Sequence, residues 1–358
     1  GRKFLVAGKG GFNLTHSEPI EQLIKRYTPT SFLEEALLNF TNTDFRDWLA
    51  QIGIPTFIGS SKRVYPTAGI KPIEVLTAIL TYLKGKGVAM KYAHTFSDWD
   101  TNNNPIINNK SIKADYTVFC LGGSSWKITG SDGSWLNTFT QKGINTKIFH
   151  PSNCGYQINW KSDFIQQYEG APLKNIAVSC GDATQKGEAV ITQFGLEGNA
   201  IYALSPQIRE GLHKNEKAFI FIDFKPSLSL EKVLSKIKAA TQKNTTAMLK
   251  KTLKLSSAQI DLLKTYLSKE SYLNVEALAN TIKKFPLAIS NAATIDEAIS
   301  TVGGVHLDAV SKNFELKQLP TQYCIGEMLD WDAPTGGYLL QACASIGVSL
   351  AKHLNEIN

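Results

Sequence analysis

The sequence predicts an α/β fold in which one discontinuous domain is interrupted by two inserted modules. Helical and strand patterns alternate near both ends of the 358-residue chain, and glycine pairs recur there. The middle instead carries strand patterns, followed by lysine-rich helical patterns. We therefore expect residues 1–150 and 300–358 to form one α/β domain, 151–224 a β-rich inserted module, and 225–299 a helical inserted module.

The two outer parts of the chain each combine helices with strands. Apolar residues recur at helical spacing over 18–27, 30–40 and 43–51, and "KPIEVLTAILTYLKGKG" predicts an amphipathic helix that ends at Gly85 or Gly87. "VAMKYAHTF" predicts a strand, and "ADYTVFCLGG" a buried strand that stops on two glycines. Near the C-terminus, "QYCIG" predicts a short strand, followed by an acidic turn and a long helix.

The central part of the chain begins with strand patterns and changes to helical patterns at about residue 226. "GYQINW", "LKNIAVSC", "EAVITQF" and "KAFIFIDF" predict strands, with a short helix near 199–209. From about 226 to 300 the apolar residues follow helical spacing, as in "LSLEKVLSKIKAATQ". Ser256 or Ser257, and then Asn274, are expected to cap the helices that begin at "SSAQIDLLKTYLS" and "NVEALANTIKKF".

The positive charge of the chain is concentrated in the helical module. Residues 225–285 contain twelve lysines, no arginine and four acids, a net charge of +8, whereas the whole chain carries +7. Such a segment can contact the phosphates of RNA, or it can be an ordinary solvated helix face. Both interpretations stay open, because charge clustering is a weak motif.

The composition excludes several classes of protein. Hydrophobic residues make up 43% of the chain, which argues against disorder, and no apolar run is long enough to cross a membrane. No signal peptide opens the sequence, which starts with Gly1. The five cysteines are scattered and show no zinc-binding spacing. We expect a soluble, cytoplasmic protein with no membrane contact and no metal site.

Three glycine-rich points predict a cofactor site. The loop "AGKGGFNLTH" occupies 7–16, and Gly122-Gly123 end a predicted strand, where missing side chains allow a diphosphate or ring system near the backbone. Gly336-Gly337 begin a helix, whose unbonded N–H groups and positive dipole end suit an electron-rich ligand edge. A tight turn would explain each point alone, but the three together favour a cofactor.

Segments in a fixed order resemble one known family. They are "GRKFLVAGKGGFNLTHSEP", "GSSKRVYPT", "DYTVFCLGGSSW", "PSNCGYQINW", "GLEGNAIYALS", "TVGGV" and "GEMLDWDAPTGGYLLQA". Over essentially its whole length the chain resembles the BaiN/RdsA-like bacterial flavoproteins, which are NAD(P)/FAD-dependent oxidoreductases. The resemblance implies a Rossmann-like FAD-binding domain, FAD as cofactor and NAD(P)H as reductant. Hydride would pass from NAD(P)H through the flavin to an unidentified small-molecule substrate.

The first glycine loop departs from the family pattern. Other branches of the family carry a cysteine in a G-G-R-C-N type loop where this chain has Gly10-Gly11-Phe12-Asn13. In the family a GxGxxG unit precedes this loop; here Gly8 and Gly10 fit that pattern, but the third glycine falls on Asn13. We therefore expect the chain to be a fragment that lacks the N-terminal GxGxxG unit and the ADP half of the FAD site.

The resemblance carries FAD contacts over to this sequence position by position. The early loop, the strand-end diglycine, the late acidic motif and the final helix start would contact the cofactor. These residues are Lys3, Gly8, Lys9, Gly10, Gly11, Asn13, Leu14, Thr15, Gly122, Gly123, Gly326, Glu327, Asp330, Gly336, Gly337, Tyr338 and Leu339. Phe96 resembles the residue whose backbone meets adenine. Asp330 would accept from a sugar or ribityl hydroxyl, whereas at Leu339 many relatives carry asparagine.

No catalytic residue stands out from the sequence. Cys154, within "PSNCGY", is a candidate acid, but a small buried thiol explains it as well. His16 and His306 flank glycine motifs and would touch flavin or substrate, unless solvent or backbone satisfies them. The run 60–63, "SSKR", could bind phosphate or be an exposed basic turn.

Two further functions remain open besides a small-molecule oxidoreductase. Some relatives resemble reductases that form dihydrouridine in ribosomal RNA, and the lysine-rich segment 225–285 would then contact RNA phosphates. A catalytically idle flavin-binding protein is the other alternative.

Overall fold

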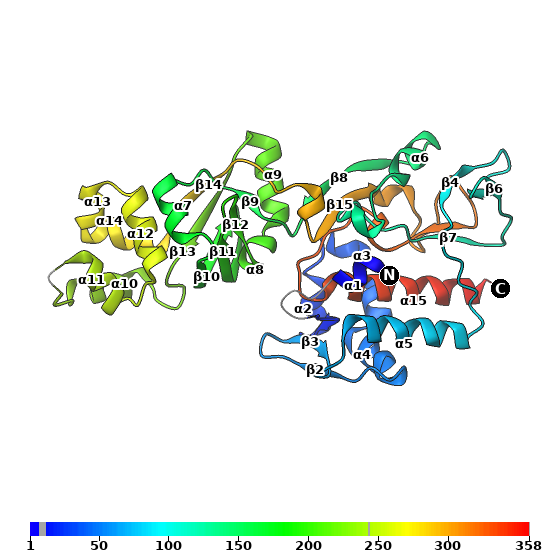
Figure 1. The fold of residues 1–358 in the computed structure, drawn as a ribbon, viewed down its shortest axis with the longest axis horizontal. Helices are drawn as coiled ribbons and strands as arrows, with labels where there is room; N and C mark the ends of the chain where they lie inside the picture. The colour runs from blue at the N-terminus through cyan, green and yellow to red at the C-terminus, as the bar shows by residue number, and fades with distance from the viewer. Residues whose placement is uncertain (7–11, 243, 358) are drawn as a thin grey trace. The chain divides into compact units, whose positions relative to one another are not determined.

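The computed structural model describes residues 1–6, 12–242 and 244–357, which fold into two compact units. Unit 1 comprises Gly1–Pro151 and Ile295–Asn358, and unit 2 comprises Ser152–Thr294. Both units combine helices with strands (Figure 1), as the predicted α/β class requires. The finer division into one outer domain and two inserted modules stays a prediction.

Unit 1 carries short strands in small sheets between helices. Its helices are α1 (Arg2–Val6), α2 (Ile20–Ile24), α3 (Thr30–Asn39), α4 (Asn42–Gln51), α5 (Pro72–Gly85), α6 (Trp135–Gln141) and α15 (Tyr338–Glu356), with the 3-10 turns η1 (Lys127–Thr129), η2 (Ile295–Glu297), η3 (Leu307–Ala309) and η4 (Gly326–Met328). Its strands are β1 (Thr15–His16), β2 (Thr56–Ile58), β3 (Arg63–Pro66), β4 (Phe96–Trp99), β5 (Pro105–Ile107), β6 (Lys110–Ser111), β7 (Thr117–Phe119), β8 (Thr146–Ser152), β15 (Ser300–Val305) and β16 (Gln322–Cys324).

The sheets of unit 1 bring distant segments together. Strands β7 and β16 pair in parallel, so the strand before the Gly122-Gly123 pair lies beside the strand that leads to η4. Strand β3 pairs antiparallel with both β1 and β2, giving the order β1-β3-β2. The remaining sheets are β15-β8 and β4-β5-β6. The sheets thus bring β1 beside β3, and β7 beside the strand that precedes η4.

Two hydrophobic cores hold unit 1. The larger core lies against α3 and α15 and contains Tyr27, Trp331 and Tyr338. The smaller core contains Leu14 beside β1, Phe45 of α4 and Val75 of α5. Burial alternates along β3, so Val64 and Pro66 are buried while Arg63 and Tyr65 are partly exposed. This sheet therefore has one face on the core and one face turned away from it.

Unit 2 is built on a six-stranded antiparallel sheet. The strand order is β14-β13-β10-β11-β12-β9. The strands are β9 (Tyr156–Gln157), β10 (Pro172–Cys180), β11 (Ala183–Ile191), β12 (Gly195–Glu197), β13 (Ala218–Asp223) and β14 (Phe285–Ile289). The helices are α7 (Ser162–Tyr168), α8 (Asn199–Tyr202), α9 (Ser205–Asn215), α10 (Leu230–Lys238), α11 (Thr245–Lys251), α12 (Ser257–Tyr266), α13 (Lys269–Leu273) and α14 (Val275–Lys283).

The predicted helix caps of unit 2 are confirmed. The Ser256 hydroxyl accepts the Gln259 N–H, and the Gln259 side chain accepts the Ser256 N–H in return. The Asn274 side chain accepts the Ala277 N–H at the start of α14. Both interactions satisfy amide groups that a helix start leaves without a partner.

Two expected elements are wrong. The segment 88–95, expected to be part of a strand, is not one; only Phe96 at its end enters β4. Its residues are exposed and Ala93 has a φ of 55°, so no neighbouring strand or core fixes an extended backbone there. The helical pattern expected up to about residue 300 ends at α14, because β14 completes the sheet beside β13. No helix in the described ranges is long and apolar enough to cross a membrane.

Candidate functional site

The first strand of unit 1 touches the start of its last helix. Gly337 has a φ of 95°, and a Cβ built on it would lie 2.5–2.7 Å from backbone atoms of Thr15. A side chain at this position would thus meet rigid backbone, and the positive φ adds strain for any other residue. The Thr15 hydroxyl donates to Gln341 Oε1 at 2.7 Å across the same junction. Glycine is what allows β1 and α15 to meet here.

This junction presents the N-terminal end of a long helix. Helix α15 has 19 residues, and its Gln341 N–H is the first to bond back, to the Gly337 carbonyl at 3.0 Å. The N–H groups before it have no acceptor within the helix, and the helix dipole makes this end positive. Neither Gly336 nor Gly337 has a side chain to cover these groups. The arrangement suits the electron-rich edge of a ligand.

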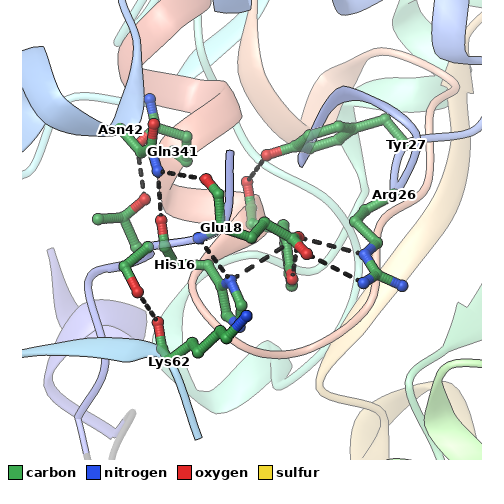
Figure 2. A network of polar contacts seen from close by, with 10 residues as sticks. His16, Glu18, Arg26, Tyr27, Asn42, Lys62 and Gln341 are labelled. Atoms are coloured by element: carbon green, nitrogen blue, oxygen red, sulfur yellow. Dashed lines mark hydrogen bonds and ion pairs between the residues drawn. The ribbon is translucent and has the colours of Figure 1, made fainter. Parts of the chain in front are cut away.

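A buried carboxylate stands at the centre of a polar network beside this helix start (Figure 2). Glu18, whose side chain is 4% exposed, accepts from Arg26 Nε at 3.2 Å and Nη2 at 3.0 Å. It also accepts from the Tyr338 hydroxyl at 2.5 Å. Burial opposes the charged form of Glu18, but the hydrogen bonds from Arg26 and Tyr338 outweigh it and lower the pKa of this carboxyl. The ionised Glu18 therefore fixes the Tyr338 ring.

The same network holds His16 as a neutral base. Its Nδ1 accepts the Glu18 N–H at 3.2 Å, and its ring stacks on Tyr338 with centroids 5.2 Å apart. Burial lowers the pKa of His16, although the nearby Glu18 carboxylate partly counteracts this. Because Nδ1 accepts a hydrogen bond, the ring proton is on Nε2, and a Ser61 backbone hydrogen bond also acts on this imidazole.

A second charged group, the Lys3 ammonium, contacts Glu327 of the late acidic motif. Lys3 of α1 donates to Ser125 Oγ at 2.8 Å and forms an ion pair with Glu327 at 3.4 Å. Asp330, expected to accept from a cofactor hydroxyl, pairs through Oδ2 with Lys147 at 2.7 Å. Burial, together with the Glu327 charge, raises the pKa of the Cys343 thiol to about 12, so this cysteine stays protonated. Lys3 and Glu327, both predicted cofactor contacts, thus lie together.

The strand-end diglycine makes close contacts of its own. A Cβ on Gly123 would lie 2.1 Å from Thr301 Oγ1, so a side chain there would displace the Thr301 hydroxyl. The carbonyl of Gly122 accepts from Trp135 Nε1 at 3.1 Å, and that of Gly123 from Ser131 Oγ at 2.6 Å. These carbonyls are therefore engaged within unit 1.

The remaining predicted residues lie in other surroundings. Phe96 packs its ring against Phe119 with centroids 5.0 Å apart, inside an aromatic cluster of unit 1. His306 lies at the start of η3, where its Nδ1 pairs with the Asp308 carboxylate at 2.6 Å. Cys154 belongs to unit 2, where it is buried and helps burial to raise the pKa of Tyr156.

The predicted early loop is only partly described. Leu14 is buried in the smaller core and its N–H donates to the Val64 carbonyl at 2.8 Å, whereas Asn13 is half-buried. Leu339 packs, partly buried, against the larger core. Gly8, Lys9, Gly10 and Gly11 lie outside the described residues.

Sequence patterns did not point to the residues that organise the site. Glu18, Arg26 and Gln341 carry no recognisable motif, and the Tyr338–Glu18 bond joins positions 320 residues apart. The one local signal was a carboxylate two residues after His16, in front of Pro19. Within the described ranges, no group of three or more histidine, cysteine or acidic residues could hold a metal ion.

The geometry defines a class of protein: a mixed α/β chain in which a glycine pair precedes a long helix, whose first-turn amides have no acceptor within the helix. Residues 1–353 match the family model described as HI0933-like protein Rossmann domain, and the chain belongs to this family. The predicted Rossmann-like class is therefore confirmed.

Individual relatives are similar to the chain over most of their length. A 3-dehydro-bile acid delta(4,6)-reductase from Clostridium scindens is 24% identical over 361 residues, which cover 95% of this chain and 87% of the relative. A ribosomal RNA dihydrouridine synthase from Escherichia coli is 22% identical, and the match covers 99% of this chain and 89% of the relative. A ribosomal RNA dihydrouridine synthase from Haemophilus influenzae is also 22% identical, over 95% of this chain and 86% of the relative. The family and the reductase confirm the predicted class, a Rossmann-like flavoprotein oxidoreductase family.

Proposed function

We propose that the protein is an FAD-dependent oxidoreductase that passes hydride from NAD(P)H through the flavin to a small-molecule substrate. The observation that carries the proposal is the contact of Thr15 with Gly337. It brings β1 and the His16–Tyr338 stack to the positive end of α15. A reductase among the relatives supports the same chemistry.

The residues present fit a flavin at this junction. A Cβ on Gly336 would lie 3.1 Å from the Tyr338 ring and 3.5 Å from Arg63 Nε, so the missing side chain keeps space among these groups. The first-turn amides of α15 would hold the electron-rich edge of the ring, and Thr15 and Lys3 would flank it. When bound, FAD accepts a hydride and passes it on.

The chain's own groups would set the conditions for that transfer. The dipole of α15 favours negative charge at its N-terminus. Glu18 holds the Tyr338 hydroxyl, and Tyr27 donates to the Tyr338 carbonyl at 2.8 Å, so both ends of this residue are fixed. His16 stacks on the Tyr338 ring and would contribute a ring face to this junction.

The absorbance spectrum of the purified full-length protein, before and after anaerobic addition of NADPH or NADH, tests this proposal. We expect flavin bands that bleach when the reductant is added. A protein that lacks flavin contradicts the assignment of the cofactor. A flavin that neither nucleotide reduces contradicts the assignment of the reductant.

A second candidate is reduction of uridine in ribosomal RNA. Two relatives bear that activity in their names, and Lys250, Lys251 and Lys254 of unit 2 are all exposed. These lysines would bind RNA phosphates, while the chemistry at the flavin would be the same.

A further inference from the structure

Helix α5 is apolar, but it buries little of its surface. Eight of its fourteen residues, from Pro72 to Gly85, are hydrophobic. Among the residues that the structure describes, Val75 is the one member of α5 that is buried, and it lies in the smaller core of unit 1. Helix α12, with ten residues, buries five of them. Because an apolar helix is normally covered along a continuous stripe, α5 presents surface that suits another helix.

A groove lies along the exposed side of α5, next to the end of α4. Its volume is about 540 Å³, and its lining includes Ile52, which caps α4, and Ile73, Thr77, Thr81 and Tyr82 of α5. Ile73 is 50% exposed and Tyr82 is 38% exposed, so two large side chains flank the groove. Thr77 and Thr81, between them in the sequence, are exposed and small, which lets a second helix approach closely.

Opposite charges lie at the two ends of the same helix. Glu74 belongs to the first turn of α5 and Lys84 to the last, and both are exposed. Positions 74, 77, 81 and 84 are three or four residues apart, so they form one stripe along the helix, the α5 stripe. The α5 stripe thus runs from a negative end, through two threonines, to a positive end. Such a stripe is complementary to a copy of itself that points in the opposite direction.

We propose that the α5 stripe forms a two-fold symmetric dimer with the α5 stripe of a second copy of this chain, with the two helices antiparallel. The register that places Glu74 opposite Lys84 of the second copy also places Thr77 opposite Thr81 of that copy, and symmetry repeats both contacts. Antiparallel packing aligns the helix dipoles favourably as well. Parallel packing would instead set Glu74 against Glu74 and Lys84 against Lys84. The charges therefore select the antiparallel arrangement, which closes at two copies.

The size of this contact predicts a weak dimer. A helix of 14 residues is about 21 Å long. A contact limited to this helix and the end of α4 belongs to the small class of interfaces, so we expect a dissociation constant of about 10 to 100 µM. No residue of the α5 stripe is among the predicted cofactor contacts. Dimerisation is therefore independent of the proposed function, and flavin content should not change in the variants below.

Sedimentation velocity of the purified full chain over a concentration series tests this proposal. We expect a reversible equilibrium between monomer and dimer. Glu74→Lys and Lys84→Glu each place like charges opposite each other at two points of the dimer, and each should weaken association about tenfold. The double variant restores opposite charges in reversed order and should recover the wild-type association. An equimolar mixture of the two single variants should likewise associate, as heterodimers.

Thr77→Arg tests the centre of the contact, because it adds a long charged side chain where the helices approach most closely. We expect it to reduce association below detection. Thr140→Arg in α6 is the matched control: Thr140 is exposed and donates to the Leu136 carbonyl at 2.9 Å, as Thr77 donates to the Ile73 carbonyl at 2.7 Å. This control should leave the dimer unchanged. A chain that stays monomeric at every concentration would overturn the proposal, as would a dimer that persists in Thr77→Arg or is not recovered in the double variant.

Discussion

Each unit of the protein contains a partly buried charge cluster, and the two clusters are built differently. In unit 2, Lys283 donates to Asp223 Oδ2 at 2.5 Å and to the carbonyls of Lys225 at 2.9 Å and Leu228 at 2.5 Å. An ammonium group has three protons, so this lysine is fully used. In unit 1, Glu18 joins Arg26 and Tyr338 beside a glycine turn, next to helix amides without an acceptor.

The difference indicates what each cluster does. Because Lys283 donates all three ammonium protons to groups of its own chain, it links β13 to the loop before α10 and has no proton left for a ligand. The Glu18 cluster instead fixes His16 and Tyr338 around the start of α15, where hydrogen-bonding capacity remains. We infer that the first cluster serves stability and the second serves binding. Four predictions test this contrast, in order of expected effect.

The largest effect should come from Gly337→Ala. The new Cβ would meet Thr15 backbone at 2.5–2.7 Å, in a backbone conformation with φ 95°. Strain and overpacking together should lower the free energy of unfolding by about 3 kcal/mol. Urea denaturation measures this loss, and the flavin content of the purified protein should fall with it.

Gly347→Ala in the same helix is the control. A Cβ on Gly347 meets nothing within 4 Å, and the residue lies in the interior of α15. Alanine there should raise the free energy of unfolding by about 0.5 to 1 kcal/mol. If both variants behaved alike, the Thr15–Gly337 contact would not be what constrains this position.

Lys283→Met should give the next largest effect. The side chains of Lys283 and Asp223 are 19% and 21% exposed, so the change leaves a carboxylate and two carbonyls without their donor. We expect the free energy of unfolding to fall by about 2 kcal/mol in urea denaturation. Lys264→Met, at an ion pair with a 43% exposed lysine, should cost at most about 0.5 kcal/mol.

The flavin readout separates the two clusters. Flavin content and reduction by NAD(P)H, measured under conditions where the Lys283→Met variant is folded, should match wild type. A loss of flavin from the folded variant would contradict a purely structural role for Lys283.

Glu18→Gln should produce a smaller, pH-dependent effect. The pKa of Glu18 is lower in the folded protein, because the Arg26 and Tyr338 hydrogen bonds overcome burial. Its stabilisation is therefore complete above the ordinary glutamate pKa of about 4.3, and is lost as pH falls through the lower folded value. We expect the variant to be about 1 kcal/mol less stable at pH 7 and equal to wild type in strong acid. A difference that does not change with pH would contradict this linkage.

Local chemistry decided which features the sequence could predict. The caps at Ser256 and Asn274, and the start of α15 after Gly337, depend on a few neighbouring residues and were predicted. The Tyr338–Glu18 bond was not, because it joins residues 320 positions apart and glutamate is usually a surface residue. The strand expected over 88–96 was wrong for the same reason. Whether a segment forms a strand depends on partner strands, which the local pattern does not reveal.

The smallest effect on stability should come from Lys250, Lys251 and Lys254. All three are exposed, so replacing them together with glutamine should change the free energy of unfolding by at most about 0.5 kcal/mol. Their effect should appear only on RNA. If the helical segment binds phosphates, filter binding of ribosomal RNA fragments across a salt series should give a log–log slope that is flatter by about 0.7 to 0.9 per lost contact. Flavin reduction should not change, because none of the three lysines belongs to the Glu18 cluster or to the start of α15. A solvated helix face instead predicts little RNA affinity in wild type and the same slope in the variant. That outcome would contradict the RNA alternative and a ligand-binding role for the lysines of unit 2. The small-molecule oxidoreductase would then be the function that the protein's features support.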